Sequence, residues 1–166
     1  MNTINIRRSI RSFNGVEVED EKVLELLKAG MQAPSAMNQQ PWEFVVVRDK
    51  NVREKLSEIS PYAKPIVLGS VVIVLTINNN NVKVVGKQDQ DMGACTQNIL
   101  LEAVEQGLAA VWIGVKPDVE RMNIISDVLS LPDNIEPFAI IAVGYSDVEN
   151  KFIDRFDKEK IHFDKY

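Results

Sequence analysis

The segment VVIVLTI, residues 71–77, constrains the fold of this chain more than any other part of the sequence. Except for one leucine, every residue in it is β-branched, and polar and apolar side chains do not alternate. Such a run favours a strand that is buried on both faces, because a half-exposed strand alternates. The run FAIIAV at residues 138–143 predicts a second strand of the same kind. The sheet that holds these strands is therefore expected inside the molecule.

Helical patterns separate the predicted strands. Helices are predicted at residues 19–31, 49–59, 88–107 and 118–129, and two further strands at residues 44–47 and 109–115. Strands that alternate with helices predict a mixed α/β layer protein. Residues 33–42, APSAMNQQPW, are bracketed by prolines and rich in small and amide side chains, which predicts an ordered loop.

Two of the helices are assigned buried faces. In the helix at 19–31, we expect Val23, Leu24, Leu27 and Met31 to share a face toward the core. The helix at 88–107 carries a broad apolar surface that includes Cys95, which predicts a central, heavily buried helix ending at Gly107. Asp89 and Asp91 are expected only to cap or solvate its start.

Length and composition bound the protein class. The chain has 166 residues, 45% of them hydrophobic, which predicts one domain spanning residues 1–166. No apolar segment reaches the roughly 18 residues of a membrane span, and no signal-peptide core follows the N-terminal arginines. We therefore expect a cytoplasmic protein without a membrane partner. The net charge of −5 argues against nucleic-acid binding. One cysteine and one histidine exclude an intrachain disulfide and argue against a zinc site.

On this acidic chain, a cluster of cations stands close to the start. The segment RRSIRSF, residues 7–13, holds Arg7, Arg8 and Arg11 with Ser9 between them. A local basic cluster suits a small anion such as phosphate, because arginine's planar fork donates paired hydrogen bonds to it. The alternative is a solvated helix end without a ligand. The phosphate-binding loops GxxxxGK[ST] and GxGxxG are absent, so side chains must hold any nucleotide-like ligand.

Taken together in chain order, five segments resemble the nitroreductase family of FMN-dependent oxidoreductases. They are RRSIRSF, APSAMNQQPWEF, DMGACTQNILLEAVEQGLAAVWIG, FAIIAVGY and DRFDKEKIHFDKY, and they span nearly the whole chain. The resemblance implies an α+β fold with a central mixed or antiparallel sheet flanked by helices. It also implies an intertwined homodimer with FMN at the subunit interface. The C-terminal tail, residues 150–166, is charged with spaced aromatic residues, so we expect it to have no core of its own and to pack on another body, such as a second subunit.

The resemblance also implies which residues bind the cofactor. Arg7 and Ser9 are expected to hold the flavin phosphate with Arg8 close by, and Arg155 to join them. Arg11 is expected to reach the N1–O2 edge of the flavin ring. The remaining expected contacts are Pro34, Ser35 and Ala36 from the partner subunit, Asn38 and Gln40 at the flavin rim or on the loop's own backbone, and Ile113 and Gly114 against the ring.

The activity implied is hydride transfer from NADH or NADPH to FMN and on to an electron-poor acceptor such as a nitroaromatic or quinone, in a ping-pong cycle. No protein nucleophile or base and no metal is expected, since the cofactor carries the chemistry. Two alternatives stay open: other flavin chemistry such as dehalogenation or dehydrogenation, and a flavin-binding module without catalysis. The segment between Ile77 and Gln88 is short, which suggests an open site and leaves the acceptor undefined.

Overall fold

The computed structural model describes residues 3–166, and its centre is a four-stranded antiparallel sheet. The strands are β1 (Trp42–Val47), β2 (Val71–Asn78), β3 (Ala109–Gly114) and β4 (Ile135–Gly144), in the spatial order β1-β2-β4-β3. All four predicted strands are confirmed. Of the two sheet types that the resemblance allowed, the antiparallel one is found.

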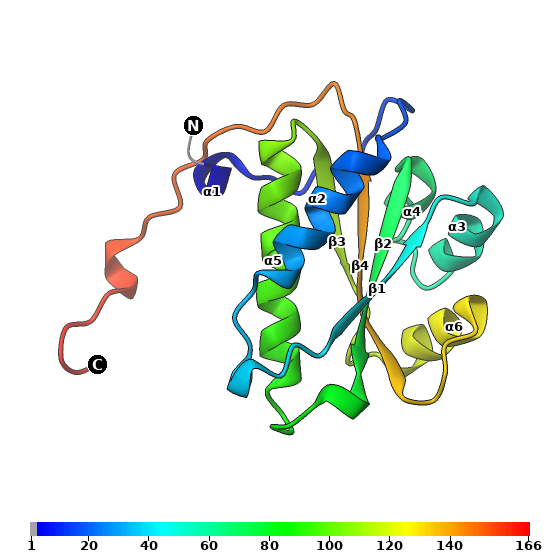
Figure 1. Ribbon diagram of the computed structural model, residues 1–166. Coiled ribbons are helices and arrows are strands. Elements are labelled where there is room, and N and C mark those ends of the chain that lie inside the picture. The colour runs from blue at the N-terminus through cyan, green and yellow to red at the C-terminus, as the bar shows by residue number, and fades with distance from the viewer. Residues whose placement is uncertain (1–2) are drawn as a thin grey trace.

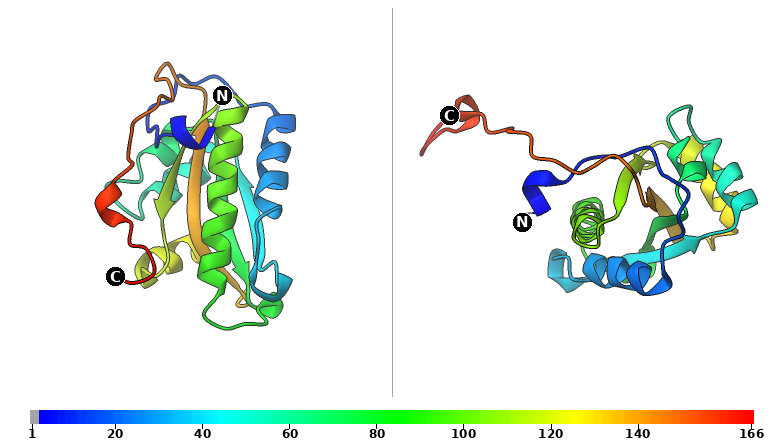
Figure 2. Two further views of the ribbon diagram at one scale, coloured as in Figure 1. Left: turned by 90° about the vertical axis from the view of Figure 1, so that its left-hand side faces the viewer. Right: turned by 90° about the horizontal axis from the view of Figure 1, so that it is seen from above.

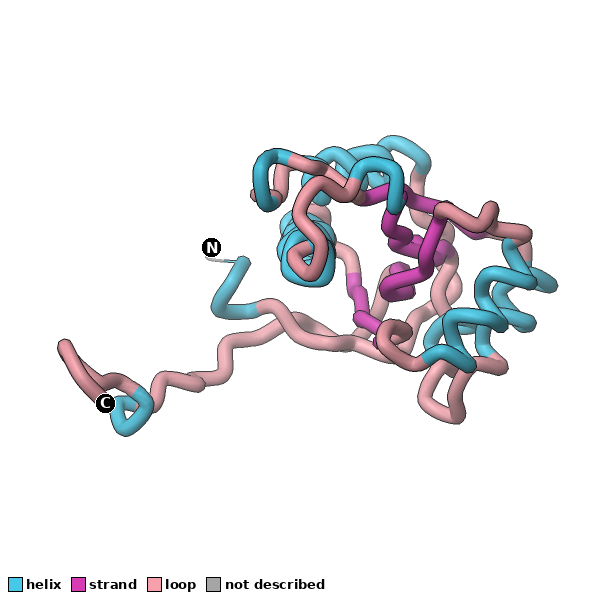
Figure 3. The backbone as a smooth tube through the Cα atoms, turned by 90° about the horizontal axis from the view of Figure 1, so that it is seen from below, coloured by secondary structure: helices cyan, strands magenta, loops and turns pink. Residues whose placement is uncertain are grey.

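Helices cover both faces of this sheet (Figure 1). One face carries α2 (Asp20–Met31) and α5 (Gln88–Glu105), and the other carries α3 (Lys50–Ser57), α4 (Pro65–Leu68) and α6 (Val119–Leu129). Figure 3, seen from below, separates the two helical layers on either side of the strands. The single-turn α1 (Thr3–Ile6) and the 3₁₀ turns η1 (Ala36–Asn38), η2 (Asn79–Asn81) and η3 (Lys158–Lys160) complete the chain.

Although helices separate the strands in sequence, no two neighbouring strands in the described sheet are parallel. Both β2 and β3 run antiparallel to β4, so β2 and β3 point the same way. The helix α5 connects them as a crossover, and β4 then enters the gap between them. The alternation of strands and helices alone could not predict this insertion, because it depends on where the last strand docks.

The sheet separates two hydrophobic layers, and β2 contributes to both. Val71, Ile73, Leu75 and Ile77 pack toward α2 and α5, whereas Val72 and Val74 pack in the layer under α3, α4 and α6. Each of these six side chains has no exposed surface. Burying one such side chain stabilises the fold by about 1.5–3 kcal/mol. The prediction of a strand buried on both faces is confirmed.

The helix boundaries follow local chemistry. The Asp49 carboxylate accepts a hydrogen bond from the Val52 amide at the start of α3, and Asp118 does the same for Arg121 at the start of α6. Gly107, which follows α5, has a φ of +71°, a conformation that glycine adopts without strain. The predicted stop at Gly107 is therefore confirmed.

The predicted inner face of α2 is wrong at two positions. Leu24 is 55% exposed and Met31 is 47% exposed, whereas Leu26, which the prediction omitted, is fully buried. The helix turns Val23, Leu26 and Gly30 inward because α5 passes closely at Gly30. The sequence pattern carries two competing apolar rows, and contact with α5 selects between them.

After β4, the chain leaves the body of the molecule and runs outward as an extended tail (Figures 1 and 2). Every residue from 151 to 166 is exposed, including aromatic side chains at 152, 156, 163 and 166. The expectation that this tail has no core of its own within the chain is confirmed. In the part of the chain that the structure describes, no helix has the length and apolar character to cross a membrane.

Candidate functional site

The segment that carries the arginine cluster runs beside β3, which is an edge strand of the sheet. The Ile10 amide donates a hydrogen bond to the carbonyl of Ala110 at 3.1 Å. Ile10 is buried, whereas its neighbours Ser9 and Arg11 are exposed. One backbone contact together with alternating side chains therefore turns Ser9 and Arg11 outward at the sheet edge.

The three arginines predicted at the phosphate line one pocket. Arg7 and Arg8 come from the N-terminal segment and Arg155 from the C-terminal tail, around a cavity of about 300 Å³. The tail is held there because the Arg8 amide donates a hydrogen bond to Oδ1 of Asn150 at 2.9 Å. Residues from the two ends of the sequence thus meet at one site.

This pocket contains three arginines and one carboxylate, Asp154, and two buried arginine donors in it are unpaired among the described residues. Arg8 Nη1 donates to the carbonyls of Arg7 and Asn5, but Arg8 Nε and Nη2 are buried and have no hydrogen-bond partner among the described residues. Burial lowers the pKa of Arg7, and the positive charges of Arg155 and Arg8 lower it further. Unpaired buried donors and crowded cations are both relieved by an anion, so the pocket fits a phosphate group.

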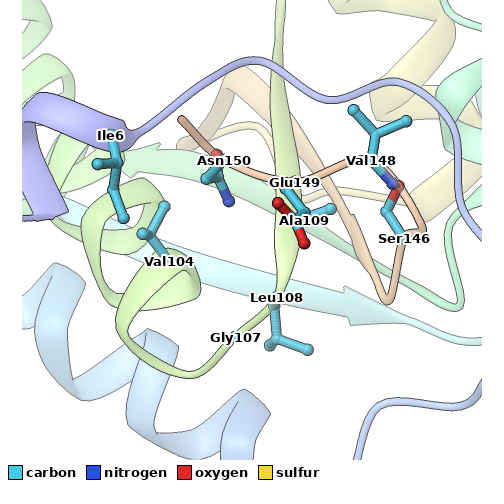
Figure 4. Close-up of a pocket in the computed structure, with 9 residues that line it drawn as sticks. All are labelled: Ile6, Val104, Gly107, Leu108, Ala109, Ser146, Val148, Glu149 and Asn150. Carbon is cyan, nitrogen blue, oxygen red and sulfur yellow. The ribbon is translucent and has the colours of Figure 1, made fainter. Parts of the chain in front are cut away.

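A second cavity, next to the arginine segment, has the opposite character (Figure 4). It occupies about 380 Å³ where α1, the C-terminal end of α5 and the start of the tail meet. Ile6, Val104 and Leu108 supply apolar walls, and among the described residues that line it Glu149 alone is charged. The acidic side chain disfavours an anion in this cavity.

Arg11 belongs to a separate pocket at the other end of β3. This pocket also includes the predicted contacts Ile113 and Gly114, and it contains Trp112 and Arg121. The Ile113 side chain packs in the core, and no heavy atom of the described residues beyond the two chain neighbours of Gly114 lies within 4 Å of where a Cβ on Gly114 would stand. The backbone at Gly114 is therefore open to close approach by a flat ligand.

The predicted loop contacts Pro34, Ser35 and Ala36 lie together in a fourth pocket of about 470 Å³, beside the start of α5. Ser35 Oγ accepts a hydrogen bond from the Gln40 amide at 3.1 Å, so its hydroxyl supports the loop's own backbone. Asn38 and Gln40 are exposed and have positive φ values of 50° and 46°.

Sequence reasoning missed the two polar residues that anchor this loop. Gln39 is 4% exposed and Asp91 is 5% exposed. The Asp91 carboxylate accepts hydrogen bonds from the Ala36 amide at 2.9 Å and from Gln39 Nε2 at 2.5 Å. The prediction that Asp91 caps or solvates a helix start is therefore wrong. Nothing in the local pattern distinguishes Gln39 from its neighbours Asn38 and Gln40, because its burial depends on α5.

Asp89 is exposed in the first turn of α5, as predicted, and it also forms an ion pair. Its carboxylate lies 2.9 Å from Lys116 Nζ, and Glu136 lies 3.0 Å from the same nitrogen. Burial alone lowers the pKa of Lys116, but hydrogen bonds and charge from Asp89 and Glu136 outweigh it and raise the pKa. The ion pairs of Lys116 with Asp89 and Glu136 fasten the start of α5 to β4 and to the chain just after β3. No group of three His, Cys, Asp or Glu side chains within residues 3–166 could hold a metal.

Within one chain, the arginine pocket and the loop pocket lie at opposite ends of α5. Ile6, next to Arg7, approaches the C-terminal end of the helix, whereas Ala36 contacts Asp91 near its N-terminal end. The helix has 18 residues and is therefore about 27 Å long. A single chain thus brings together Arg7, Arg8 and Arg155, and separately Arg11, Ile113 and Gly114, but it does not unite these groups with Pro34–Ala36.

Comparisons with known proteins place this fold and these segments in one class. The sequence profile of the nitroreductase family matches residues 4–63 and 71–145. A protein of Archaeoglobus fulgidus, provisionally named NADH dehydrogenase/NAD(P)H nitroreductase, is 39% identical over 98% of this chain and 96% of its own length.

Solved structures with names of the same kind have a closely similar fold. A protein of Clostridium acetobutylicum, provisionally named NADH oxidase, has a TM-score of 0.96 at 48% identity over 99% of both chains. An FMN-dependent nitroreductase of Clostridium difficile has a TM-score of 0.90 at 31% identity, again over 99% of both chains. The chain belongs to the nitroreductase family. The predicted family and its α+β fold are confirmed.

Proposed function

We propose that this protein is an FMN-dependent oxidoreductase that passes hydride from NADH or NADPH to an electron-poor acceptor such as a nitroaromatic or a quinone. Family membership supports the enzyme class, and the names of the relatives support both FMN and NAD(P)H. When bound, FMN supplies the chemistry by accepting hydride at N5 and releasing it to the second substrate in a ping-pong cycle. The protein residues would bind the FMN, orient its ring and tune its redox potential.

The observation that carries the proposal is the arginine pocket. Arg8 presents two buried donors that lack partners among the described residues, beside Arg7 and Arg155. We assign the FMN phosphate to this pocket, with Ser9 on the same segment. A phosphate bound there satisfies both donors and offsets the mutual repulsion of the three cations.

The flavin ring is assigned to the β3 edge. Arg11 lies in one pocket with Ile113 and Gly114, so a ring placed there meets a cation at one edge and an open backbone along another. A cation near N1 and O2 stabilises negative charge on the ring and raises its potential. Ile113 keeps the strand fixed because its side chain is anchored in the core.

The predicted loop contacts are assigned to a second copy of the chain. Pro34, Ser35 and Ala36 lie about one length of α5 from the arginine pocket of their own chain, and the family resemblance implies that a partner subunit presents them to the flavin. We therefore propose a homodimer with FMN at the interface, in which the exposed tail of each chain packs on the other. The exposed aromatic residues Phe152, Phe156 and Phe163 support this, since a tail in water gains nothing from them.

An absorbance spectrum of the purified protein tests the proposal directly. It is recorded before and after anaerobic addition of NADH and, separately, NADPH. The expected result is a bound flavin spectrum that bleaches with at least one nucleotide and returns on addition of a quinone. Absence of bound flavin, even after added FMN, overturns the proposal. A flavin that neither nucleotide reduces rejects the electron donor and favours the other flavin chemistries.

A further inference from the structure

We infer that Asp91 and Gln39 form a hydrogen-bonded clamp that positions the loop at residues 34–40 for contact with the flavin. The effect of the clamp on flavin binding rests on the proposed function, whereas its hydrogen bonds are present in the chain by itself. It assigns a positioning role to two residues that do not face the arginine pocket or the β3 edge.

Asp91 supplies the fixed end of the clamp. It stands in the first turn of α5, next to Met92, whose side chain is fully buried in the core. One carboxylate oxygen accepts the Ala36 amide and the other accepts Gln39 Nε2. Both bonds cross from the helix to the loop, between segments that are far apart in the sequence.

Gln39 extends the clamp to a third segment. Its Oε1 accepts hydrogen bonds from the amides of Lys83 and Val84, each at 2.9 Å. The amide group of Gln39 therefore uses its donor toward Asp91 and its acceptor toward the chain between β2 and α5. Hydrogen bonds that pass through two buried side chains thus join the loop, the helix and this segment.

The loop needs such a tether because its backbone is strained. Met37, Asn38 and Gln40 have φ values of 51°, 50° and 46°, in the left-handed region that residues other than glycine disfavour. A run of such residues persists only where its surroundings fix it. The clamp supplies that constraint on both sides of Met37, at Ala36 and at Gln39. Pro34–Ala36 are thus presented in one conformation before any ligand arrives.

The direction of the hydrogen bonds makes the clamp testable. Asp91→Asn places an NH₂ group against the NH₂ of Gln39. If the Gln39 amide rotates by 180°, its oxygen can accept from the introduced asparagine. Its NH₂ group then faces the Lys83 and Val84 amides, which are also donors.

A double variant, Asp91→Asn with Gln39→Glu, restores every pair by exchanging the donor and the acceptor. The introduced asparagine accepts from the Ala36 amide through its Oδ1 and donates through its Nδ2 to the introduced glutamate. The second oxygen of that glutamate accepts from the Lys83 and Val84 amides, as Gln39 Oε1 does in the natural chain.

The experiment measures FMN affinity by fluorescence titration and amide hydrogen exchange in the flavin-free chain. For Asp91→Asn we expect an FMN Kd raised roughly tenfold or more and faster exchange at Ala36, Lys83 and Val84, because a buried donor loses its acceptor. The swapped double variant should recover both. Asp89→Asn is the matched control: it removes a carboxylate on the same helical turn that pairs with Lys116, and both readouts should stay near wild type.

The possible outcomes are distinguishable. If Asp91→Asn fails to fold, the double variant alone decides, since only the clamp predicts that a second change at Gln39 rescues folding and Kd together. Wild-type Kd and exchange in Asp91→Asn, or no recovery in the double variant, overturn the clamp. If wild type binds no FMN, the proposed function fails, while the exchange rates still test the clamp.

Discussion

Burial makes Cys95 chemically inert. The side chain has no exposed surface, and burial raises the pKa of the thiol to about 12. A disulfide reagent that needs the thiolate should therefore leave the native protein unlabelled near pH ~8 and label it fully after unfolding. The measurement is a timed thiol titration with and without denaturant. Rapid labelling of the native protein would contradict the expected packing of Cys95 as a small apolar side chain.

Arg11 is the residue through which the proposed ring site is best tested. Arg11→Ala should weaken FMN binding about tenfold or shift its midpoint potential, because a charge-assisted contact to the ring is lost. Arg48→Ala is the control from outside the pocket, since its guanidinium donates to Asp20 and to the carbonyl of Val18, and flavin binding should stay near wild type. Flavin content, potential and activity all unchanged in Arg11→Ala would remove Arg11 from the site.

Lys116 links pH to stability. Its folded pKa is raised above the unfolded value, so the pairs with Asp89 and Glu136 contribute fully below the unfolded pKa of about 10.4 and are lost as pH rises through the folded value. Lys116→Met should cost about 2 kcal/mol at neutral pH. Urea titrations at several pH values should show this difference shrink on the alkaline side. A difference independent of pH would refute the pairing.

At the scale of elements, helices α2 and α5 pack closely at Gly30. A Cβ on Gly30 would stand 2.9 Å from two side-chain carbons of Ile99 and 3.2 Å from Cys95 Sγ. Gly30→Ala should therefore destabilise the fold by about 1 kcal/mol, despite alanine's higher helix propensity, because the buried Ile99 must move. Denaturant unfolding measures this directly.

The same pair gives a sharper test. Ile99→Ala alone should cost about 2–5 kcal/mol, because it leaves a cavity in the core. In the Gly30→Ala background, the cost should be about 1 kcal/mol smaller, since the added methyl group occupies part of that space. Additive costs would mean that the two positions do not contact each other in solution.

For the whole molecule, the central prediction concerns assembly. Light scattering should give about twice the chain mass of 18.7 kDa. A chain that ends at Asn150 lacks only residues that are exposed here, so its core should fold, but it should be monomeric and lose most of its FMN. A full-length monomer that retains FMN at full occupancy would contradict the interface site.

Local sequence patterns predicted most of the strands and helices and part of the candidate site. The β-branched run at residues 71–77 indicated a buried strand because its side chains leave no polar face, and the helices followed from their own apolar periodicity. The ordered motifs also identified the family and the arginine cluster. These features are readable because each depends on residues close together in the chain.

Other features depend on contacts between distant segments and appeared only in the folded chain. The insertion of β4 between β2 and β3 made the sheet antiparallel, and the approach of α5 at Gly30 selected the inner face of α2. Gln39 and Asp91, 52 positions apart, became buried partners because the loop docks on α5. A polar side chain is buried only where a partner satisfies it, and the position of that partner is set by tertiary packing and not by neighbours in sequence.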